Sequence, residues 1–250
     1  MEPVSNLTAK LMEKCDEVHG ECETHGKQSV FLPKFLKVKE WACPTCAADK
    51  AKSDMQNAWL VERQENLHRI AHIPHKYRGQ RFEATTPAQK TARSTARAFR
   101  DLISTSRTWA VLVLFGGVGT GKTLLASELG ESIINNLNMS VRYCTAKQMI
   151  AEIQASYGAE GKSEEGEVLR FVQYDLLILD EIDAKRDSDS ANLLLTEVIN
   201  RRYNEEKPMV VITNQPFDNL SKFVGDRVDD RLHENAYVCS FDWPSFRRQS

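Results

Sequence analysis

Eight consecutive residues combine glycines with a lysine and a hydroxyl in the order of a phosphate-binding loop. They are Gly116, Gly117, Val118, Gly119, Thr120, Gly121, Lys122 and Thr123. An apolar run over residues 111–115 precedes this loop and a helical pattern follows it, which is the context such a loop requires. Glycines let main-chain N–H groups converge on phosphate oxygens at the start of a helix. We therefore expect ATP here, with Lys122 contacting the β- and γ-phosphates and Thr123 binding Mg²⁺.

Two carboxylates, Asp180 and Glu181, follow a second apolar run over residues 176–179. At the end of a buried strand, Asp180 is placed to hold Mg²⁺ and Glu181 to polarise an attacking water. The second carboxylate favours hydrolysis over phosphate transfer to a small molecule. A third run ends at Asn214, and the carboxyl ends of parallel strands meet at one edge of a sheet. Asn214 is therefore expected beside the loop, bonded to the γ-phosphate or to the attacking water.

Four of the six cysteines lie in the first fifth of the chain, and the other two stand alone in strand-like stretches. Without an export signal, clustered cysteines indicate metal binding rather than disulfides. Two pairs have the spacing of metal knuckles, Cys22 with His25 and Cys43 with Cys46, and Cys₃His is a closed tetrahedral set for structural Zn²⁺. The pair Cys15 and His19 is an alternative source of two ligands. A redox dithiol at Cys43 and Cys46 is a second alternative.

The chain divides into a cysteine-rich part, a helical connection and a larger α/β part, for which we predict boundaries at residues 1–50, 51–75 and 76–250. An alternating stretch over residues 30–38 indicates hairpin strands, and a helix is expected to start near Pro87. From residue 109 onward, five β-branched runs alternate with helical patterns, which predicts a parallel sheet. The runs span residues 109–115, 140–144, 175–180, 208–213 and 236–241.

Composition sets broad limits on the kind of protein. The 250 residues are 41% hydrophobic and 27% charged with a formal net charge of −2, which excludes a collagen-like or wholly disordered chain. No apolar run approaches the roughly 18–20 residues that a membrane span needs. The first residues lack the apolar core of a signal peptide. We expect a cytoplasmic protein with no membrane contact.

The three motifs, in their order and spacing, resemble those of AAA+ ATPases, and among these most closely the DnaC-type replicative helicase loaders. The likeness begins near residue 75 and includes two further segments, Gly-Asp-Arg-Val-Asp-Asp-Arg-Leu over residues 225–232 and Trp-Pro-Ser-Phe-Arg over residues 243–247. Transposition ATPases of the IstB type share much of this pattern. The resemblance implies a three-layer αβα ATPase domain with a five-stranded parallel sheet.

The resemblance also implies roles for four residues outside the loop. Arg231 matches the arginine finger that reaches the γ-phosphate bound by a neighbouring subunit, with Arg227 one helical turn earlier as the second candidate. Arg247 matches a residue that senses nucleotide in its own subunit. Tyr157 lies where an aromatic ring could stack on a base of single-stranded DNA, although the same position suits a tyrosine that packs between helices.

The function implied is that of a helicase loader, which uses ATP to place a replicative ring helicase of the DnaB type on single-stranded DNA. Self-assembly is implied by the finger, and phage-encoded loaders of this kind sometimes carry an N-terminal zinc finger. The first alternative is an IstB-like transposition-associated ATPase. The second is a zinc module that tethers partners beside a degenerate ATPase, and the intact Lys122, Asp180, Glu181 and Arg231 speak against it.

Overall fold

The structure is a computed structural model that describes residues 14–35, 41–106, 108–157, 161, 163–184 and 189–248. The chain forms two compact units, residues 1–63 and residues 64–250. The boundary between the two units falls inside one continuous helix, α2 (Pro44–Ala71). The three-part division at residues 50 and 75 that the sequence suggested stays a prediction.

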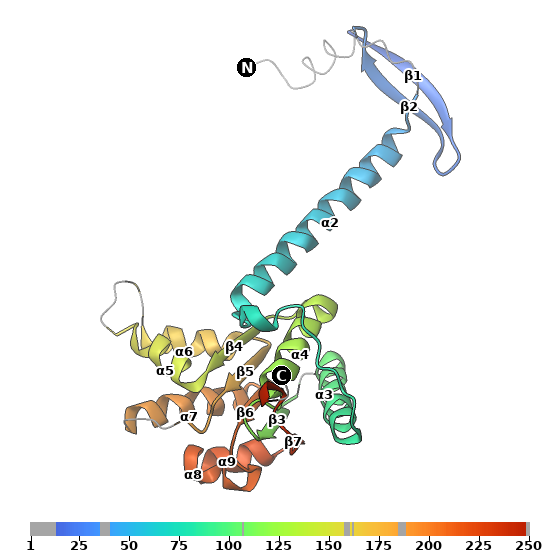
Figure 1. The fold of residues 1–250 in the computed structure, drawn as a ribbon. Helices are drawn as coiled ribbons and strands as arrows, with labels where there is room; N and C mark the ends of the chain where they lie inside the picture. The colour runs from blue at the N-terminus through green and yellow to red at the C-terminus, as the bar shows by residue number, and fades with distance from the viewer. Residues whose placement is uncertain are drawn as a thin grey trace. The chain divides into compact units, whose positions relative to one another are not determined.

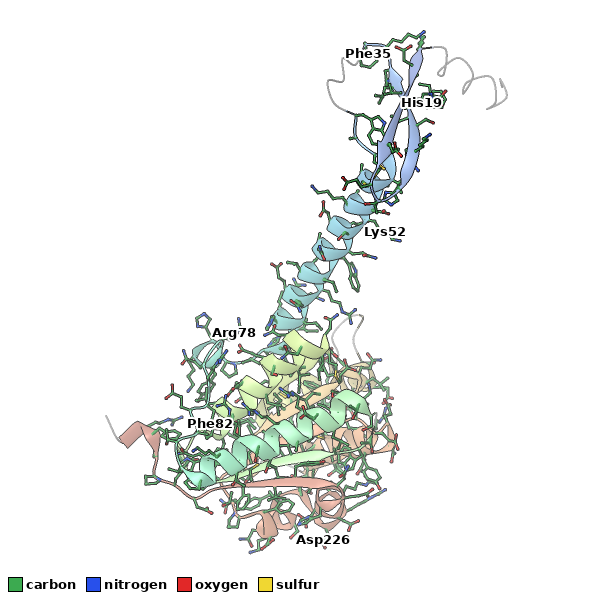
Figure 2. All side chains as sticks on the ribbon, turned by 90° about the vertical axis from the view of Figure 1, so that its right-hand side faces the viewer. His19, Phe35, Lys52, Arg78, Phe82 and Asp226 are labelled. Carbon is green, nitrogen blue, oxygen red and sulfur yellow. The ribbon has the colours of Figure 1, made fainter. Side chains whose placement is uncertain are left out.

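The first unit contains an antiparallel hairpin followed by the beginning of α2. Strand β1 (Cys15–Cys22) pairs with β2 (Gly26–Pro33), and Gly26 closes the turn with a φ of +67°. Figure 2 shows His19 on the hairpin, Phe35 just after it and Lys52 on α2. The strand pattern over residues 30–38 was therefore placed too late: only its first part is in β2, and residues 36–40 lie outside the described ranges.

Helix α2 begins at Pro44, before the predicted start at residue 51. A proline suits the first turn of a helix because its missing N–H would have no partner there. The early start places Cys46 inside the helix, and the main-chain N–H of Cys46 donates a hydrogen bond to the Cys43 sulfur (3.5 Å). The helix therefore begins within the Cys43–Cys46 knuckle.

The second unit is built on a five-stranded parallel sheet, as the sequence predicted (Figure 1). Its strands, in chain order, are β3 (Val111–Gly116), β4 (Val141–Thr145), β5 (Leu176–Asp180), β6 (Met209–Thr213) and β7 (Ala236–Phe241). In space the order is β4-β5-β6-β3-β7. The strand that leads into the glycine loop therefore lies between β6 and β7.

Helices cover both faces of this sheet (Figure 1). They are α3 (Pro87–Thr105), α4 (Lys122–Leu137), α5 (Ala146–Gln154), α6 (Glu164–Gln173), α7 (Asp189–Asn204), α8 (Ser221–Val224) and α9 (Asp226–His233), with short 3₁₀ turns η1 (His75–Tyr77), η2 (Phe217–Asn219) and η3 (Phe246–Arg248). Side chains that alternate along the central strands divide the core in two. Val111 and Val113 pack with α5, α6 and α7, whereas Leu112 and Leu114 pack with α3 and α4. Cys144 and Cys239 are buried.

Within the described ranges, the helices are all too short or too polar to cross a membrane.

The predicted start of α3 at Pro87 is confirmed by a complete capping box. The Thr86 hydroxyl accepts a hydrogen bond from the Gln89 N–H (3.3 Å), and the Gln89 side chain accepts one from the Thr86 N–H (3.0 Å).

Candidate nucleotide and metal sites

The glycine loop connects β3 to α4 and contains positions that only glycine suits. Gly116 has a φ of +127° and Gly119 a φ of +78°, in the region that residues with a Cβ avoid. A Cβ on Gly116 would lie 2.6 Å from the main-chain oxygen of Phe241, and one on Gly119 would lie 2.2 Å from the Ser245 hydroxyl. The loop is therefore held against the last strand and the segment that follows it.

Lys122 is buried at the first position of α4, and its amino group makes three hydrogen bonds. It donates to the main-chain oxygens of Gly116 (2.8 Å) and Gly117 (2.7 Å) and to Oδ1 of Asn214 (3.0 Å). Burial lowers the pKa of Lys122, and the nearby carboxylate of Asp180 opposes that shift. The structure thus places Asn214 beside the loop, where the parallel-strand argument expected it.

Asp180 ends β5 and its two carboxylate oxygens each have partners. Oδ2 accepts hydrogen bonds from the Thr123 hydroxyl (2.9 Å) and from the Tyr143 hydroxyl (2.7 Å), and Oδ1 accepts one from the Glu181 N–H (2.8 Å). Glu181 is exposed and has a φ of +53°, which is uncommon for a residue with a side chain. Thr123 and Asp180 therefore lie together as a Mg²⁺ site requires.

These residues line one cavity of about 290 Å³. Its walls include the loop from Val118 to Thr123, the pair Asp180 and Glu181, and Asn214. Among the described residues, this cavity brings together the loop residues, the acidic pair and the strand-end asparagine that the sequence assigned to ATP. The exceptions are Gly116 and Gly117, which do not line the cavity but whose main-chain oxygens accept hydrogen bonds from Lys122.

Sequence reasoning missed two contributors to this cavity from opposite ends of the unit. Tyr77 and Phe246 line it together with the predicted Arg247, which is exposed. The segment around Phe246 is fixed to the loop, because the Phe246 N–H donates to the Gly119 oxygen (2.9 Å) and the Trp243 indole N–H donates to the Thr120 oxygen (2.9 Å). Arg247 therefore lies where it can contact nucleotide in its own subunit.

Arg231 lies near the amino-terminal end of β3, whereas the glycine loop follows the carboxyl-terminal end of that strand. The main-chain oxygen of Arg231 accepts a hydrogen bond from the Trp109 indole (3.0 Å), and Trp109 precedes β3, whose far end becomes the glycine loop. Six strand residues separate the two ends by roughly 20 Å, which is too far for an arginine side chain. Arg231 is half-buried and Arg227 is exposed. Neither arginine lines the nucleotide cavity of its own chain.

Tyr157 lies in the turn after α5 and is 53% exposed. A hydrogen bond to Glu164 raises the pKa of its hydroxyl. Helix α5 ends at Gln154, three residues before Tyr157. Residues 158–160 and 162 lie outside the described ranges, and α6 begins at Glu164. A ring exposed in a turn is consistent with base stacking, which stays a prediction.

The first unit brings Cys22, His25, Cys43 and Cys46 together, with their ligand atoms all within 4.8 Å of one another. The Cys22 and Cys46 sulfurs are 3.5 Å apart, and His25 Nδ1 is 3.3 Å from the Cys46 sulfur and 3.7 Å from the Cys43 sulfur. A tetrahedral ion with Zn–S bonds of about 2.3 Å and a Zn–N bond of about 2.1 Å holds its ligand atoms about 3.5–3.8 Å apart. The four residues therefore fit Zn²⁺, although zinc binding itself stays a prediction.

Electrostatics at this cluster favours a bound cation. Hydrogen bonds from the main-chain N–H groups of His25 and Thr24 lower the pKa of the Cys22 thiol to about 6. The neighbouring Cys22 sulfur in turn raises the pKa of Cys46 to about 12, as expected when thiolates crowd together without a metal. The other ring nitrogen of His25, Nε2, lies 3.3 Å from the Asp49 carboxylate, the usual outer partner of a metal-binding histidine. Sequence reasoning did not identify Asp49.

The alternative ligand pair lies elsewhere on the hairpin. Cys15 pairs with Pro33 at one end of the two strands, whereas Cys22 pairs with Gly26 at the other. Seven residues of strand separate the two cysteines by roughly 23 Å. His19 pairs with Ser29 and is also outside the cluster. Within the described residues, the Cys15 and His19 pair therefore does not join the ligand group.

The comparison with known families agrees with the geometry of the nucleotide cavity. Residues 54–250 match the family described as IstB-like ATP binding protein. The chain belongs to this family. The uncharacterized protein YdaV of Escherichia coli K12 is 26% identical over 211 residues, which are 84% of this chain and 84% of that protein. The replicative helicase loader DnaC of the same organism is 27% identical over 139 residues, or 55% of this chain.

Solved structures of replication proteins share the fold of the second unit. The DnaC helicase loader superimposes with a TM-score of 0.56 at 21% identity, covering 64% of this chain and 93% of that one. A replication initiator DnaA bound to AMPPCP and single-stranded DNA gives 0.56 at 16% identity, covering 69% of this chain and 52% of that one. The predicted AAA+ fold is thus confirmed. In sequence the chain spans 56% of the length of its DnaC relative.

Proposed function

We propose that this protein is an ATP-driven helicase loader, which delivers a replicative ring helicase onto single-stranded DNA. The observation that carries the proposal is the separation of the hydrolytic groups. Lys122, Thr123, Asp180 and Glu181 gather at one cavity, while Arg231 lies near the opposite end of β3. The cavity contains Lys122 and Arg247, whereas Arg231, which we propose as the source of a further cation for the transition state, lies outside it.

Hydrolysis follows from the residues at the cavity. Bound Mg²⁺ would polarise the γ-phosphate of ATP, and Thr123 and Asp180 would hold the metal. Lys122 would exchange its bonds to the loop oxygens for bonds to phosphate. Glu181 would orient the attacking water and accept its proton while the water oxygen bonds to the γ-phosphorus and the bond from that phosphorus to the β–γ bridging oxygen breaks, which leaves ADP and inorganic phosphate. Arg231 from a neighbouring subunit completes the site, so turnover depends on assembly.

A helicase loader must hold two partners, and the chain has two units to do so. The second unit carries the nucleotide cavity, the exposed Tyr157 and an arginine available to a neighbour, so we assign ATP-dependent assembly on single-stranded DNA to it. DnaC, described as a replicative helicase loader, and the DNA-bound DnaA share its fold, which supports this assignment. We assign the helicase to the first unit, where the predicted zinc site supplies folding energy that about sixty residues could not obtain from a core.

The family itself supports a second candidate, an ATPase that accompanies a transposase. The cavity would serve both functions equally well, so the protein partner separates them. Sequence similarity to a protein named as a replicative helicase loader, over 139 residues, together with the fold shared with the DnaC helicase loader, makes helicase loading our first choice.

The decisive experiment combines the full chain with purified ring helicase from its host and a single-stranded circular DNA coated with single-strand binding protein. Helicase loading predicts unwinding of an annealed primer only when this protein and ATP are both present. The Lys122→Ala variant is the matched control. Unwinding that does not require this protein, together with ATP-dependent retention of a transposase, would favour the second candidate.

A further inference from the structure

We propose that the hydroxyl of Tyr143 positions the Asp180 carboxylate for Mg²⁺, so that this tyrosine sets the metal dependence of the nucleotide site. The inference rests on the proposed function, since it concerns the same site. Tyr143 lies in β4, outside the glycine loop and outside the acidic pair, and it does not line the cavity. It is therefore a positioning residue and makes no contact with substrate.

The register of the sheet brings the two side chains together. Strand β4 runs parallel to β5, with Tyr143 opposite Ile178 and Thr145 opposite Asp180. Tyr143 is 9% exposed, and its ring packs in the core on the α4 face of the sheet. From that position the hydroxyl reaches forward to Asp180 Oδ2 at 2.7 Å.

The bond from Tyr143 is one of three hydrogen bonds that orient the Asp180 carboxylate. Oδ1 accepts from the main-chain N–H of Glu181, and the second donor to Oδ2 is Thr123 on α4. Thr123 must also offer a lone pair to Mg²⁺, so its hydroxyl has two tasks. Tyr143 has one task and sits on the neighbouring strand, so it fixes the carboxylate independently of the metal.

The hydrogen bond from Tyr143 to Asp180 is short, at 2.7 Å, and both residues are buried. Hydrogen bonds to charged groups are stronger than neutral ones. Loss of this bond leaves Asp180, which is 7% exposed, with two of its three hydrogen bonds and so with a less closely fixed carboxylate.

The test is a Mg²⁺ titration of Tyr143→Phe, which removes one oxygen and keeps the ring. We expect the Mg²⁺ concentration for half-maximal binding of a fluorescent ATP analogue to rise about tenfold. Nucleotide affinity in EDTA should not change. The matched control is Tyr237→Phe in β7, whose ring contacts Phe99 (centroids 5.8 Å apart) and does not line the cavity. It should titrate like the unaltered protein.

A second comparison shows whether Tyr143 acts through Asp180. In an Asp180→Asn background, Tyr143→Phe should shift the Mg²⁺ midpoint no further, because the group it positions is gone. An unchanged midpoint in Tyr143→Phe, or an additive shift in the double variant, overturns the inference and leaves the proposed function standing. Absence of Mg²⁺-dependent nucleotide binding in the unaltered protein would remove both.

Discussion

The guanidinium of Arg231 lies over the ring of Tyr203, with its Cζ 4.8 Å from the ring centroid. The Tyr203 hydroxyl donates a hydrogen bond to Glu234 (2.6 Å), and its ring meets Trp109 edge-on, so the platform beneath the arginine is fixed. Nη1 of Arg231 is buried and has no hydrogen-bond partner among the described residues. Such a donor carries a free-energy cost until something accepts from it.

Arg231→Ala is expected to lower ATP hydrolysis by about 10³-fold while nucleotide affinity stays near normal, since the arginine acts only in the transition state. Mixing two different variants tests more directly whether Arg231 acts on a neighbouring subunit. Subunits with Arg231→Ala keep an intact cavity, and subunits with Glu181→Gln keep an intact arginine. Their mixture should hydrolyse ATP faster than either variant alone, measured as phosphate release. A mixture with the Arg231→Ala, Glu181→Gln double variant is the control and should gain nothing.

Lys122→Ala and Glu181→Gln should separate binding from hydrolysis. The lysine contacts phosphate in the ground state, so its loss is expected to abolish ATP binding. The glutamate acts on water, so Glu181→Gln should bind ATP and lose hydrolysis by two orders of magnitude or more. Equilibrium binding of a fluorescent analogue and phosphate release measure the two effects. Normal turnover by Glu181→Gln would show that another residue activates the water.

Gly116→Ala should destabilise the second unit by about 1–3 kcal/mol, because its φ is positive and the new Cβ would meet a main-chain oxygen. Gly117→Ala is the matched control. Its nearest contact is the Thr120 methyl at 3.4 Å, and its φ is not positive, so the free energy of unfolding should change little. Urea denaturation of both variants without nucleotide measures the difference. Equal losses would mean that the contact with Phe241 does not constrain the loop.

One Zn²⁺ per chain is expected, held by Cys22, His25, Cys43 and Cys46. Cys43→Ser should lose the metal and unfold the first unit, whereas Cys15→Ser should retain it, because Cys15 lies at the other end of the hairpin. Metal analysis of the purified variants decides the ligand set. Zinc kept by Cys22→Ser and lost from Cys15→Ser would show that the alternative pair is correct.

Local patterns were sufficient for much of this protein. The glycine loop, the acidic pair and the five strands were all identifiable from the sequence, and the strands begin and end within two residues of their predicted limits. These features depend on neighbours along the chain. An apolar run forms a strand, glycines permit a tight turn, and the lysine near the end of the loop lies close to its main-chain oxygens. The spacing of the Cys/His knuckles is equally local.

Tertiary structure alone decided what these motifs contact. Tyr143 meets Asp180 only because β4 and β5 are neighbours in one register, and Trp243 braces the loop only because β7 lies beside β3. Arg231 lies away from the nucleotide cavity because its main chain contacts Trp109, which precedes β3 at the end opposite the glycine loop. Hydrophobic periodicity says which face of a strand is buried and leaves strand order and register open. Strand order and register determine which side chains meet, and the packing of the whole sheet determines both strand order and register.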